Sequence, residues 1–419
     1  MRHIAIIGSG ISGLTAAYLL SKKHNVTVFE RDSRIGGHTA TVDVEKNGRQ
    51  YAIDTGFIVF NDRTYPNFLK LLSEIGIDKN PTEMSFSVQN CNTGLEYNGH
   101  NLNTLFAQRR NLFNVNFWQL IREILRFNKL CLSMHQQQSY ASGQQLGSFL
   151  AKYQFSRYFA EHYILPMGAA IWSTSLVQME QFDVKFFIQF FKNHGLLSVN
   201  NRPQWYVVPQ GSRSYLAPLC QPFNDNIVLN SNITGITRSS DKVYIQFDNQ
   251  DVQAFDDVVI SCHSDQALAL LKDATSEEKH ILGDMPYNAN DVVLHTDINL
   301  LPKQKRAWAS WNYQLSNERN RPASLTYNMN ILQGIDSEDT FCVTLNQSAD
   351  IEEASILKSF VYHHPVFSEK FIQAQQRRDK ICGKGRTHFA GAYWYNGFHE
   401  DGVRSAVDVA KRFDCHLTG

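Results

Sequence analysis

The sequence predicts an α/β protein in which an α+β domain is inserted into a nucleotide-binding domain of the Rossmann type. Three observations predict this fold class. A glycine-rich turn stands between an apolar run and a helical pattern near the start, and a strand, an Ala-Gly turn and a helix follow each other at 387–407. Between them lies an aromatic-rich stretch, 104–200, whose spacing is mainly helical.

The first segment has a strand–turn–helix–strand pattern. An apolar run leads into Gly8-Ser9-Gly10-Ile11-Ser12-Gly13, helical spacing follows, and a second apolar run ends at Glu30. In such a turn the first glycine allows the tight bend, the second admits a pyrophosphate, and the third lets helix and strand pack closely. The N–H groups of the helix that begins near Ile11 point at the phosphates. Glu30 can accept hydrogen bonds from ribose hydroxyls, so FAD or NAD fits better than NADP. The expected cofactor contacts are Gly8, Gly10, Ile11, Ser12, Gly13 and Glu30.

A second glycine pair follows directly, in Arg31-Asp32-Ser33-Arg34-Ile35-Gly36-Gly37-His38. The pair lets the chain pass close to a cofactor, and the Arg34 guanidinium presents a fixed fork to phosphate. The pattern Glu30-x-x-x-Arg34-x-Gly36-Gly37 resembles the extension found in flavoproteins of the amine oxidase, protoporphyrinogen oxidase and phytoene desaturase superfamily. Those proteins usually carry arginine after the glycine pair, where this chain has His38.

The closing segment carries the third match. A strand ends at Ala390-Gly391, and a helix begins near Glu400 after a short loop. The superfamily ends in the same way: its Ala-Gly turn contacts the ribitol, and the next helix N-terminus points at the flavin O2 end, where a reduced flavin gathers negative charge. The family's acid after Ala-Gly is replaced by Ala392, and Asp54-Thr55-Gly56 resembles its acid-x-Gly turn near the flavin. The resemblance implies further FAD contacts from Arg31, Arg34, Gly36, Gly37, His38, Thr55, Gly56, Gly391, Ala392, Gly402 and Val403.

These segments together predict a discontinuous, Rossmann-like FAD-binding domain of the glutathione-reductase type. We expect it to comprise residues 1–85, 203–288 and 376–419. The substrate-binding domain then comprises 86–202 and 289–375, with a helical portion at about 104–200. Strand-like runs alternate with polar loops over 290–365, which favours an antiparallel sheet.

Two stretches of the helical portion allow two interpretations each. Residues 104–133 predict a helix with an apolar stripe from Phe117 to Leu125 and a basic side made of Arg122, Arg126 and Lys129. Such a helix either lies on an anionic bilayer or packs on the domain core with its basic side in water. Tyr163–Trp172 either lines a pocket or packs around the break at Pro166.

Composition excludes several classes of protein. The 40 Lys and Arg balance the 40 Asp and Glu, so no global field attracts nucleic acid. No apolar run is long enough to span a bilayer, and the first apolar run is too short for a signal peptide. The seven cysteines are scattered without a C-x-x-C, which favours a reducing cytoplasm and no metal site. We expect a cytoplasmic protein whose only membrane contact is peripheral, on anionic lipid.

The chemistry expected is that of a bound flavin. Only one dinucleotide turn is visible, which favours direct oxidation of a small-molecule or lipid substrate, with oxygen or a membrane quinone as acceptor. No catalytic triad is visible; the side chains expected to line the flavin face are Phe398, Trp394 and His295. Amine oxidases of the superfamily usually carry tyrosine where Phe398 stands and a lysine on a strand comparable to Asp291–Asp297, which has none.

Over nearly its full length the chain most closely resembles bacterial predicted NAD/FAD-binding, amine-oxidase-like proteins. Some of these are linked to acyl-chain modification, including a desaturation step that leads to furan fatty acids. The resemblance implies an FAD-dependent oxidoreductase that dehydrogenates a hydrophobic substrate, such as a lipid acyl chain, by hydride transfer to flavin N5. An FAD-dependent amine oxidase and a flavin-binding protein without net oxidation are the alternatives.

Overall fold

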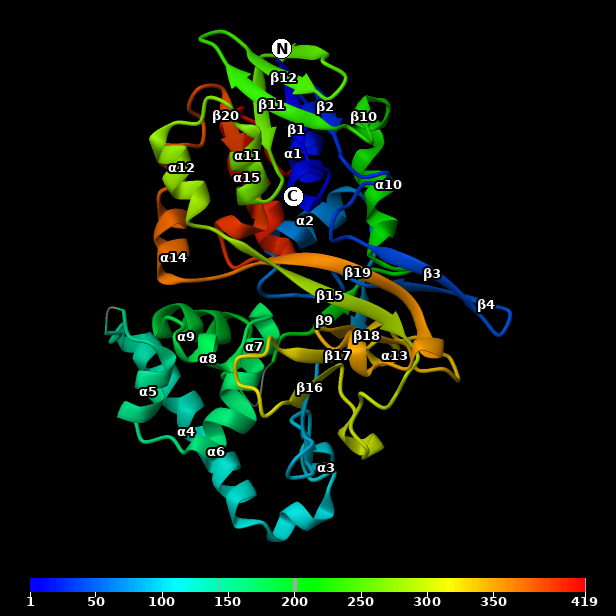
Figure 1. Ribbon diagram of the computed structural model, residues 1–419, viewed down its shortest axis with the longest axis vertical. Helices are drawn as coiled ribbons and strands as arrows, with labels where there is room; N and C mark the ends of the chain where they lie inside the picture. Colours follow the sequence, from blue (N-terminus) through cyan, green and yellow to red (C-terminus); the bar gives the residue numbers. More distant parts are fainter. Residues whose placement is uncertain (142, 199–201, 419) are drawn as a thin grey trace.

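The computed structural model describes residues 1–141, 143–198 and 202–418. The chain forms an upper unit, which contains the N-terminus, and a lower unit of sheet and helices (Figure 1). Segments far apart in sequence meet in each unit: the blue start and the red end of the chain lie together in the upper one. The predicted mixed α/β fold with a parallel sheet is confirmed.

A five-stranded parallel sheet forms the centre of the upper unit, in the order β10-β2-β1-β14-β20. Its middle strands are continuous apolar runs because both faces are covered, and Ile6 lies between Val28 and Val259. The strands are β1 His3–Ile7, β2 Asn25–Phe29, β10 Ile227–Val228, β14 Asp257–Ile260 and β20 Thr387–Phe389.

Helices and a small antiparallel sheet surround this parallel sheet. The helices are α1 Ile11–Ser21, α2 Pro66–Glu74, α10 Leu216–Cys220, α11 Ser264–Leu270, α12 Ser276–Gly283, α14 Glu369–Gln376 and α15 His399–Lys411. The small sheet consists of β11 Ile233–Arg238, β12 Val243–Phe247 and β13 Val252–Phe255. Helices α1 and α15 pack against each other, so the two ends of the chain share one core.

The lower unit is built on a seven-stranded sheet in the order β19-β15-β18-β17-β16-β7-β8. The strands of the 290–365 region pair antiparallel with one another, as predicted, and only the added pairing of β16 with the earlier strand β7 is parallel, so the whole sheet is mixed. The reason is that β7 precedes the long helical insertion, and such a connection imposes no antiparallel direction. The strands are β7 Phe86–Asn90, β8 Leu95–Asn98, β15 Tyr287–His295, β16 Trp311–Leu315, β17 Ser324–Asn328, β18 Cys342–Leu345 and β19 Ile356–Pro365.

Two smaller sheets lie between these units. They are made of β3 Thr41–Lys46 with β4 Arg49–Asp54, and of β5 Phe60–Asn61, β9 Trp205–Val207 and β6 Asn80–Thr82. Helix α13 Met329–Gln333 packs beside them, and the Gln333 side chain bonds to Asp54 across this contact.

The helical part of the lower unit has an aromatic core. Its helices are α3 Leu102–Leu105, α4 Val115–Gln137, α5 Leu146–Lys152, α6 Arg157–Phe159, α7 Leu165–Trp172, α8 Leu176–Glu180 and α9 Val184–Asn193. Trp172, at the end of the Tyr163–Trp172 stretch, packs into this core, where its ring lies 4.5 Å from Phe182 and 4.8 Å from Phe190. In the described ranges no helix is long and apolar enough to cross a membrane.

Helix α4 differs in detail from the expected amphipathic helix. Phe117 and Leu120 are buried as predicted, but Leu125 is 51% exposed because the buried stripe turns toward Phe127 instead. Arg126 does not belong to a free basic side. Its guanidinium donates to the carbonyls of Tyr153 and Gln154 and so holds the loop after α5.

Candidate functional site

The glycine turn lies at the carboxyl end of β1, where ligands bind in open parallel sheets. Gly8 has a φ of +98° and bends the chain. A Cβ on Gly13 would lie 1.9 Å from the Gly8 carbonyl oxygen, so only glycine lets α1 start this close to the strand. A Cβ on Gly10 would meet nothing within 4 Å, which leaves open space in front of the turn.

The second glycine pair lies directly beside this turn. The Gly36 N–H donates to the Ser9 carbonyl, and a Cβ on Gly37 would lie 3.3 Å from the Gly10 Cα. The Arg34 guanidinium donates to the carbonyls of Gly37 and Thr39 at 2.9 and 3.3 Å. In this structure Arg34 therefore shapes the loop that carries the glycine pair.

Glu30 connects the two loops. Its carboxylate accepts from the N–H and hydroxyl of Ser9, at 2.9 and 2.5 Å, and from the N–H of Asp32 at 2.9 Å. The exposed Arg31 lies 3.9 Å from the Asp32 carboxylate. The acid expected to hold a ribose thus stands at the end of β2 and already orders the glycine turn.

Two helix N-termini meet at this place. A Cβ on Gly402 would lie 2.7 Å from Ile11 Cγ2 and 2.9 Å from Ser12 Oγ, so the first turns of α15 and α1 touch. The N-cap of α1 is Gly10, which offers no side-chain acceptor, and its first turn has no acid. Val403 is fully buried behind this contact. Free helical N–H groups without an internal acceptor suit a pyrophosphate, and these residues fit FAD.

The Ala-Gly turn completes this end of the site. The Gly391 N–H donates to Ser405 Oγ at 2.8 Å, and the Tyr393 ring fills the space that a Gly391 side chain would need. Ala392 begins a 3₁₀ turn that ends at Trp394. The Trp394 indole is buried beneath the Arg378 guanidinium, 5.4 Å from its ring centre.

Thr55 and Gly56 bring the upper unit against the lower sheet. A Cβ on Gly56 would lie 2.2 Å from the His38 carbonyl oxygen, so the two loops are in close contact. Thr55 Oγ1 and the Tyr362 hydroxyl on β19 are 2.8 Å apart and share a hydrogen bond. Thr55 and Gly56, which are expected cofactor contacts, therefore lie where the two units meet.

Histidine and tyrosine rings gather at that boundary, which we call the junction. The His38 ring lies 5.0 Å from Tyr362, 5.9 Å from His364 and 6.1 Å from His263. The His263 ring stacks on Tyr287, the first residue of β15, at 4.1 Å. The junction is thus made of His38 and His263 from the upper unit and of Tyr287, Tyr362 and His364 from the lower sheet.

Burial makes the junction histidines neutral at physiological pH. Desolvation, with a further contribution from the Arg34 guanidinium, lowers the pKa of His38 to about 4, and desolvation together with the neighbouring histidines lowers that of His263 and His364 to about 3. His38 Nε2 is buried without a hydrogen-bond partner. Within the described ranges, no group of three or more His, Cys, Asp or Glu side chains lies close enough together to hold a metal ion.

A second chain of contacts links α15 to the same loops. The Tyr215 hydroxyl bonds to Thr39 Oγ1 at 2.5 Å and to His399 Nε2 at 2.8 Å. The His399 ring stacks on Phe57 with centres 3.6 Å apart. Burial lowers the pKa of His399 well below its usual value, so this histidine is also neutral.

Tyr215→Phe tests whether this link is structural. The change leaves Thr39 Oγ1 and His399 Nε2 buried without their partner, which should lower the free energy of unfolding by about 1–3 kcal/mol. Urea unfolding of the purified variant measures this. Tyr206→Phe is the matched control, since no hydrogen bond joins the Tyr206 hydroxyl to another described residue. Equal stability of both variants would contradict the assignment.

The three side chains expected at the flavin face lie in different places. Phe398, just before α15, stacks on Phe190 of α9 at 5.1 Å, so it faces the helical part of the lower unit. His295 ends β15, and its ring bonds to Thr344 Oγ1 and to the N–H of Asp297. Eight residue steps along the strand lead from Tyr287 to His295, roughly 26 Å at 3.3 Å each. The structure therefore brings Phe398 near the boundary and leaves His295 remote from the junction.

Sequence reasoning missed most of the junction. It named His38 but not His263, Tyr287, Tyr362 or His364. A signal existed for His263, since it follows a buried strand at the carboxyl edge of the parallel sheet. No such signal marks Tyr362 and His364, because strand β19, on which both stand, was not predicted.

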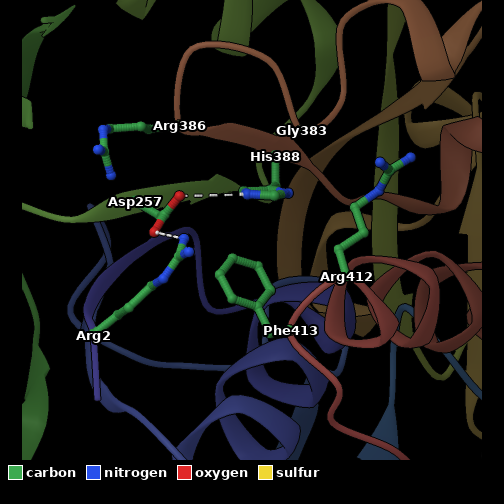
Figure 2. A pocket seen from close by; sticks show the side chains of 7 residues that line it. All are labelled: Arg2, Asp257, Gly383, Arg386, His388, Arg412 and Phe413. Atoms are coloured by element: carbon green, nitrogen blue, oxygen red, sulfur yellow. Dashed lines mark hydrogen bonds and ion pairs between the residues drawn. The ribbon is translucent and has the colours of Figure 1, made fainter. Parts of the chain in front are cut away.

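A cavity of about 290 Å³ lies at the opposite edge of the parallel sheet (Figure 2). Asp257, the first residue of β14, pairs there with Arg2 at 2.8 Å and with His388 at 3.7 Å. The remaining lining residues are Gly383, Arg386, Arg412 and Phe413. None of them is a predicted site residue, and cofactors of such sheets bind at the carboxyl edge, so this cavity is not the cofactor site.

Comparison with known proteins agrees with this geometry. A family model described as flavin containing amine oxidoreductase matches residues 11–296. The L-amino-acid oxidase of Gloydius blomhoffii is 48% identical over 48 residues, which are 11% of this chain and 10% of that protein. The chain thus aligns with only about a tenth of the length of the first curated relatives.

Solved structures extend the similarity to the whole fold. The fatty acid isomerase from P. acnes that produces CLA superposes with a TM-score of 0.68 and 16% identity, covering 98% of both chains. Cyclohexylamine oxidase from Brevibacterium oxydans superposes with a TM-score of 0.69 and 15% identity, covering 99% of both chains. At such identities the likeness shows a shared fold.

Proposed function

Because the chain belongs to the family of flavin-containing amine oxidoreductases, whose cofactor is FAD, we propose that it dehydrogenates a hydrophobic substrate such as a lipid acyl chain. FAD bound in this family accepts a hydride from a substrate carbon at its N5 atom. The cofactor would be held by the glycine turns, Glu30 and the N-termini of α1 and α15. The lower unit would then present the substrate.

The observation that carries the proposal is that the rings of the junction are themselves uncharged. Its five side chains are tyrosines and histidines, and the three histidines stay neutral because they are buried. Phe398 and Phe190 continue this surface with two stacked apolar rings. An uncharged, ring-lined boundary is complementary to an apolar group and excludes water from it.

The same geometry is poorly suited to an amine, the first alternative. An ammonium group is bound best by a free carboxylate. The acids that flank the junction loops are already engaged: Asp54 accepts from the N–H and hydroxyl of Ser212, Glu400 from the N–H groups of Asn67 and Phe68, and Asp401 from the N–H of Phe398. These contacts leave an amine substrate without an obvious counter-charge.

Isomerisation without net oxidation is the second alternative. It is suggested by the fold shared with the fatty acid isomerase from P. acnes, an enzyme that acts on an acyl chain. Dehydrogenation and isomerisation differ in the mass of the product, since only the first removes two hydrogen atoms.

Anaerobic mixing distinguishes the three reactions. The FAD-loaded protein is mixed with phospholipids in detergent micelles, with free unsaturated fatty acids, and with a panel of amines and amino acids. We expect the flavin absorbance to bleach with a lipid and the product to lack two hydrogen atoms. Bleaching by amines alone, or a lipid product of unchanged mass, would contradict the proposal. The variant Gly10→Val, expected to lack FAD, is the control for cofactor-independent change.

A further inference from the structure

Large apolar side chains are exposed at the end of the lower unit that lies farthest from the N-terminus (Figure 1). Phe113 is 90% exposed, Val115 79% and Leu102 75%. They stand on α3, on the 3₁₀ turn Arg109–Phe113 and on the first turn of α4. We call residues 99–122, together with the adjoining 302–308, the tip. Several large exposed apolar side chains gathered on neighbouring turns favour an interaction surface.

The exposed side chains are held in fixed positions by local hydrogen bonds. Asn101 caps α3 by accepting from the Thr104 N–H at 3.0 Å, and Asn114 caps α4 by accepting from the N–H of Asn116 at 3.0 Å. The Trp118 indole N–H donates to the Leu112 carbonyl at 2.9 Å. The apolar groups are therefore displayed by ordered turns, which lowers the entropy cost of docking.

The tip is also uniformly basic. Residues 99–122 and 302–308 contain no Asp or Glu. Six exposed cations lie in them: Arg109, Arg110, Arg122, Lys303, Lys305 and Arg306. The two segments adjoin, because α3 contacts the 3₁₀ turn Lys305–Ala307 and the buried Glu96 accepts from the N–H groups of Lys303 and Gln304.

These charges are not neutralised within the tip. Arg109 donates to the carbonyls of Asn103 and Phe106, and Arg110 donates to the carbonyl of Gly94. Neutral carbonyls orient the two guanidinium groups without cancelling their charge. With the whole chain balanced in charge, this cluster is a local feature of one surface.

We propose that the tip docks on an anionic phospholipid bilayer. Phe113, Val115 and Leu102 enter the boundary between headgroups and acyl chains, and the six cations meet lipid phosphates. A second copy of the chain is a poorer occupant, because two basic tips would repel each other. Docking extends the proposed acyl-chain activity by bringing the enzyme to the surface that contains such chains, but it does not require that activity.

Vesicle flotation tests the docking with the FAD-loaded protein. Vesicles of phosphatidylcholine alone are compared with vesicles that also contain phosphatidylglycerol, at low and high salt. We expect flotation with the anionic vesicles only, and weaker flotation at high salt because salt screens exposed charges. Equal flotation with both vesicles, or none with either, would overturn the proposal.

Two variants separate the charged and the apolar contributions. Arg122→Gln/Lys303→Gln/Arg306→Gln should weaken partitioning about 100-fold. Phe113→Ser/Val115→Ser should weaken it at least about tenfold. The matched controls lie on the upper unit: Lys70→Gln/Lys279→Gln/Lys411→Gln for charge, and Val252→Ser for an exposed apolar residue. Docking through the tip would be contradicted if the controls lost flotation, or if the tip variants floated as well as the unchanged protein.

Two further readouts keep this inference apart from the proposed function. Flavin bleaching by micellar lipid should be unchanged in the tip variants, because micelles deliver substrate without a bilayer. Bleaching without flotation would overturn the docking and leave the proposed function intact. Flotation without bleaching would overturn the proposed function and leave the docking intact. If the protein does not float and instead forms a dimer in gel filtration that the tip variants abolish, then the tip binds a second copy of the chain. That result would overturn the proposal that the tip docks on a bilayer.

Discussion

Gly10→Val is expected to abolish FAD binding while the protein still folds. The backbone at Gly10 has φ −66° and ψ 174°, an extended conformation that valine adopts without strain. The Cβ of the added side chain meets no protein atom within 4 Å, because the space beside Gly10 is open. It would fill the place that a pyrophosphate needs, which should raise the dissociation constant of FAD at least about 100-fold, or about 2.7 kcal/mol. Bound FAD after gel filtration measures the loss.

Gly13→Val is the matched comparison. Its Cβ would lie 1.9 Å from the Gly8 carbonyl oxygen, a backbone atom that cannot move aside cheaply. It should destabilise the cofactor-free protein by about 3 kcal/mol or more, whereas Gly10→Val should cost about 1 kcal/mol at most as a poorer helix cap. If Gly10→Val retained FAD with normal affinity, the glycine turn would not be the cofactor site.

Stability should fall steeply as the pH drops from 6.5 toward 4. An unfolded histidine takes up a proton near pH 6.5, but His38 in the folded protein does so only near pH 4, and His263 and His364 near pH 3. Unfolding therefore takes up protons in this window, and each such histidine removes up to about 1.4 kcal/mol of stability per pH unit. His194 and His295, whose pKa burial lowers to about 4, act in the same direction.

Buried acids oppose this effect but are outnumbered. Burial raises the pKa of Asp54 to about 6 and that of Asp401 to about 7, and it also raises the pKa of Glu400. These groups bind protons in the folded protein first, so they add stability as the pH falls. Six buried histidines, His399 included, outnumber these three carboxyls, so unfolding still takes up protons and stability falls as the pH drops.

Urea unfolding of the FAD-loaded protein at several pH values measures this slope. His364→Gln, which can keep the bond to Ser173, should reduce the slope by about 1.4 kcal/mol per pH unit. His280→Gln, on an exposed turn of α12, is the control and should leave it unchanged. A slope that does not respond to His364→Gln would mean that this histidine is not buried in its neutral form.

The cofactor half of the site was predictable because its signals are local. The spacing of Gly8, Gly10 and Gly13 between two apolar runs specifies a strand, a turn and a helix wherever it occurs. The helix after Gly391 was predicted for the same reason, and the structure begins it at His399. Local backbone demands of this kind do not depend on the rest of the chain.

The substrate half was less predictable because it depends on distant pairings. Tyr362 and His364 reach the junction only because β19 pairs with β15 from Tyr287 onward. The parallel contact between β16 and β7 joins segments more than two hundred residues apart, which no local pattern encodes. At Leu125 the helical period was right, but the face that tertiary packing buries was shifted.

We expect FAD in this protein to remove hydrogen from an acyl chain. The most direct test is a single anaerobic turnover with purified phospholipid in micelles, followed by mass spectrometry of the lipid. We expect one lipid product lacking two hydrogen atoms for each flavin reduced. A flavin that no lipid bleaches, or a purified protein that does not take up FAD, would contradict it.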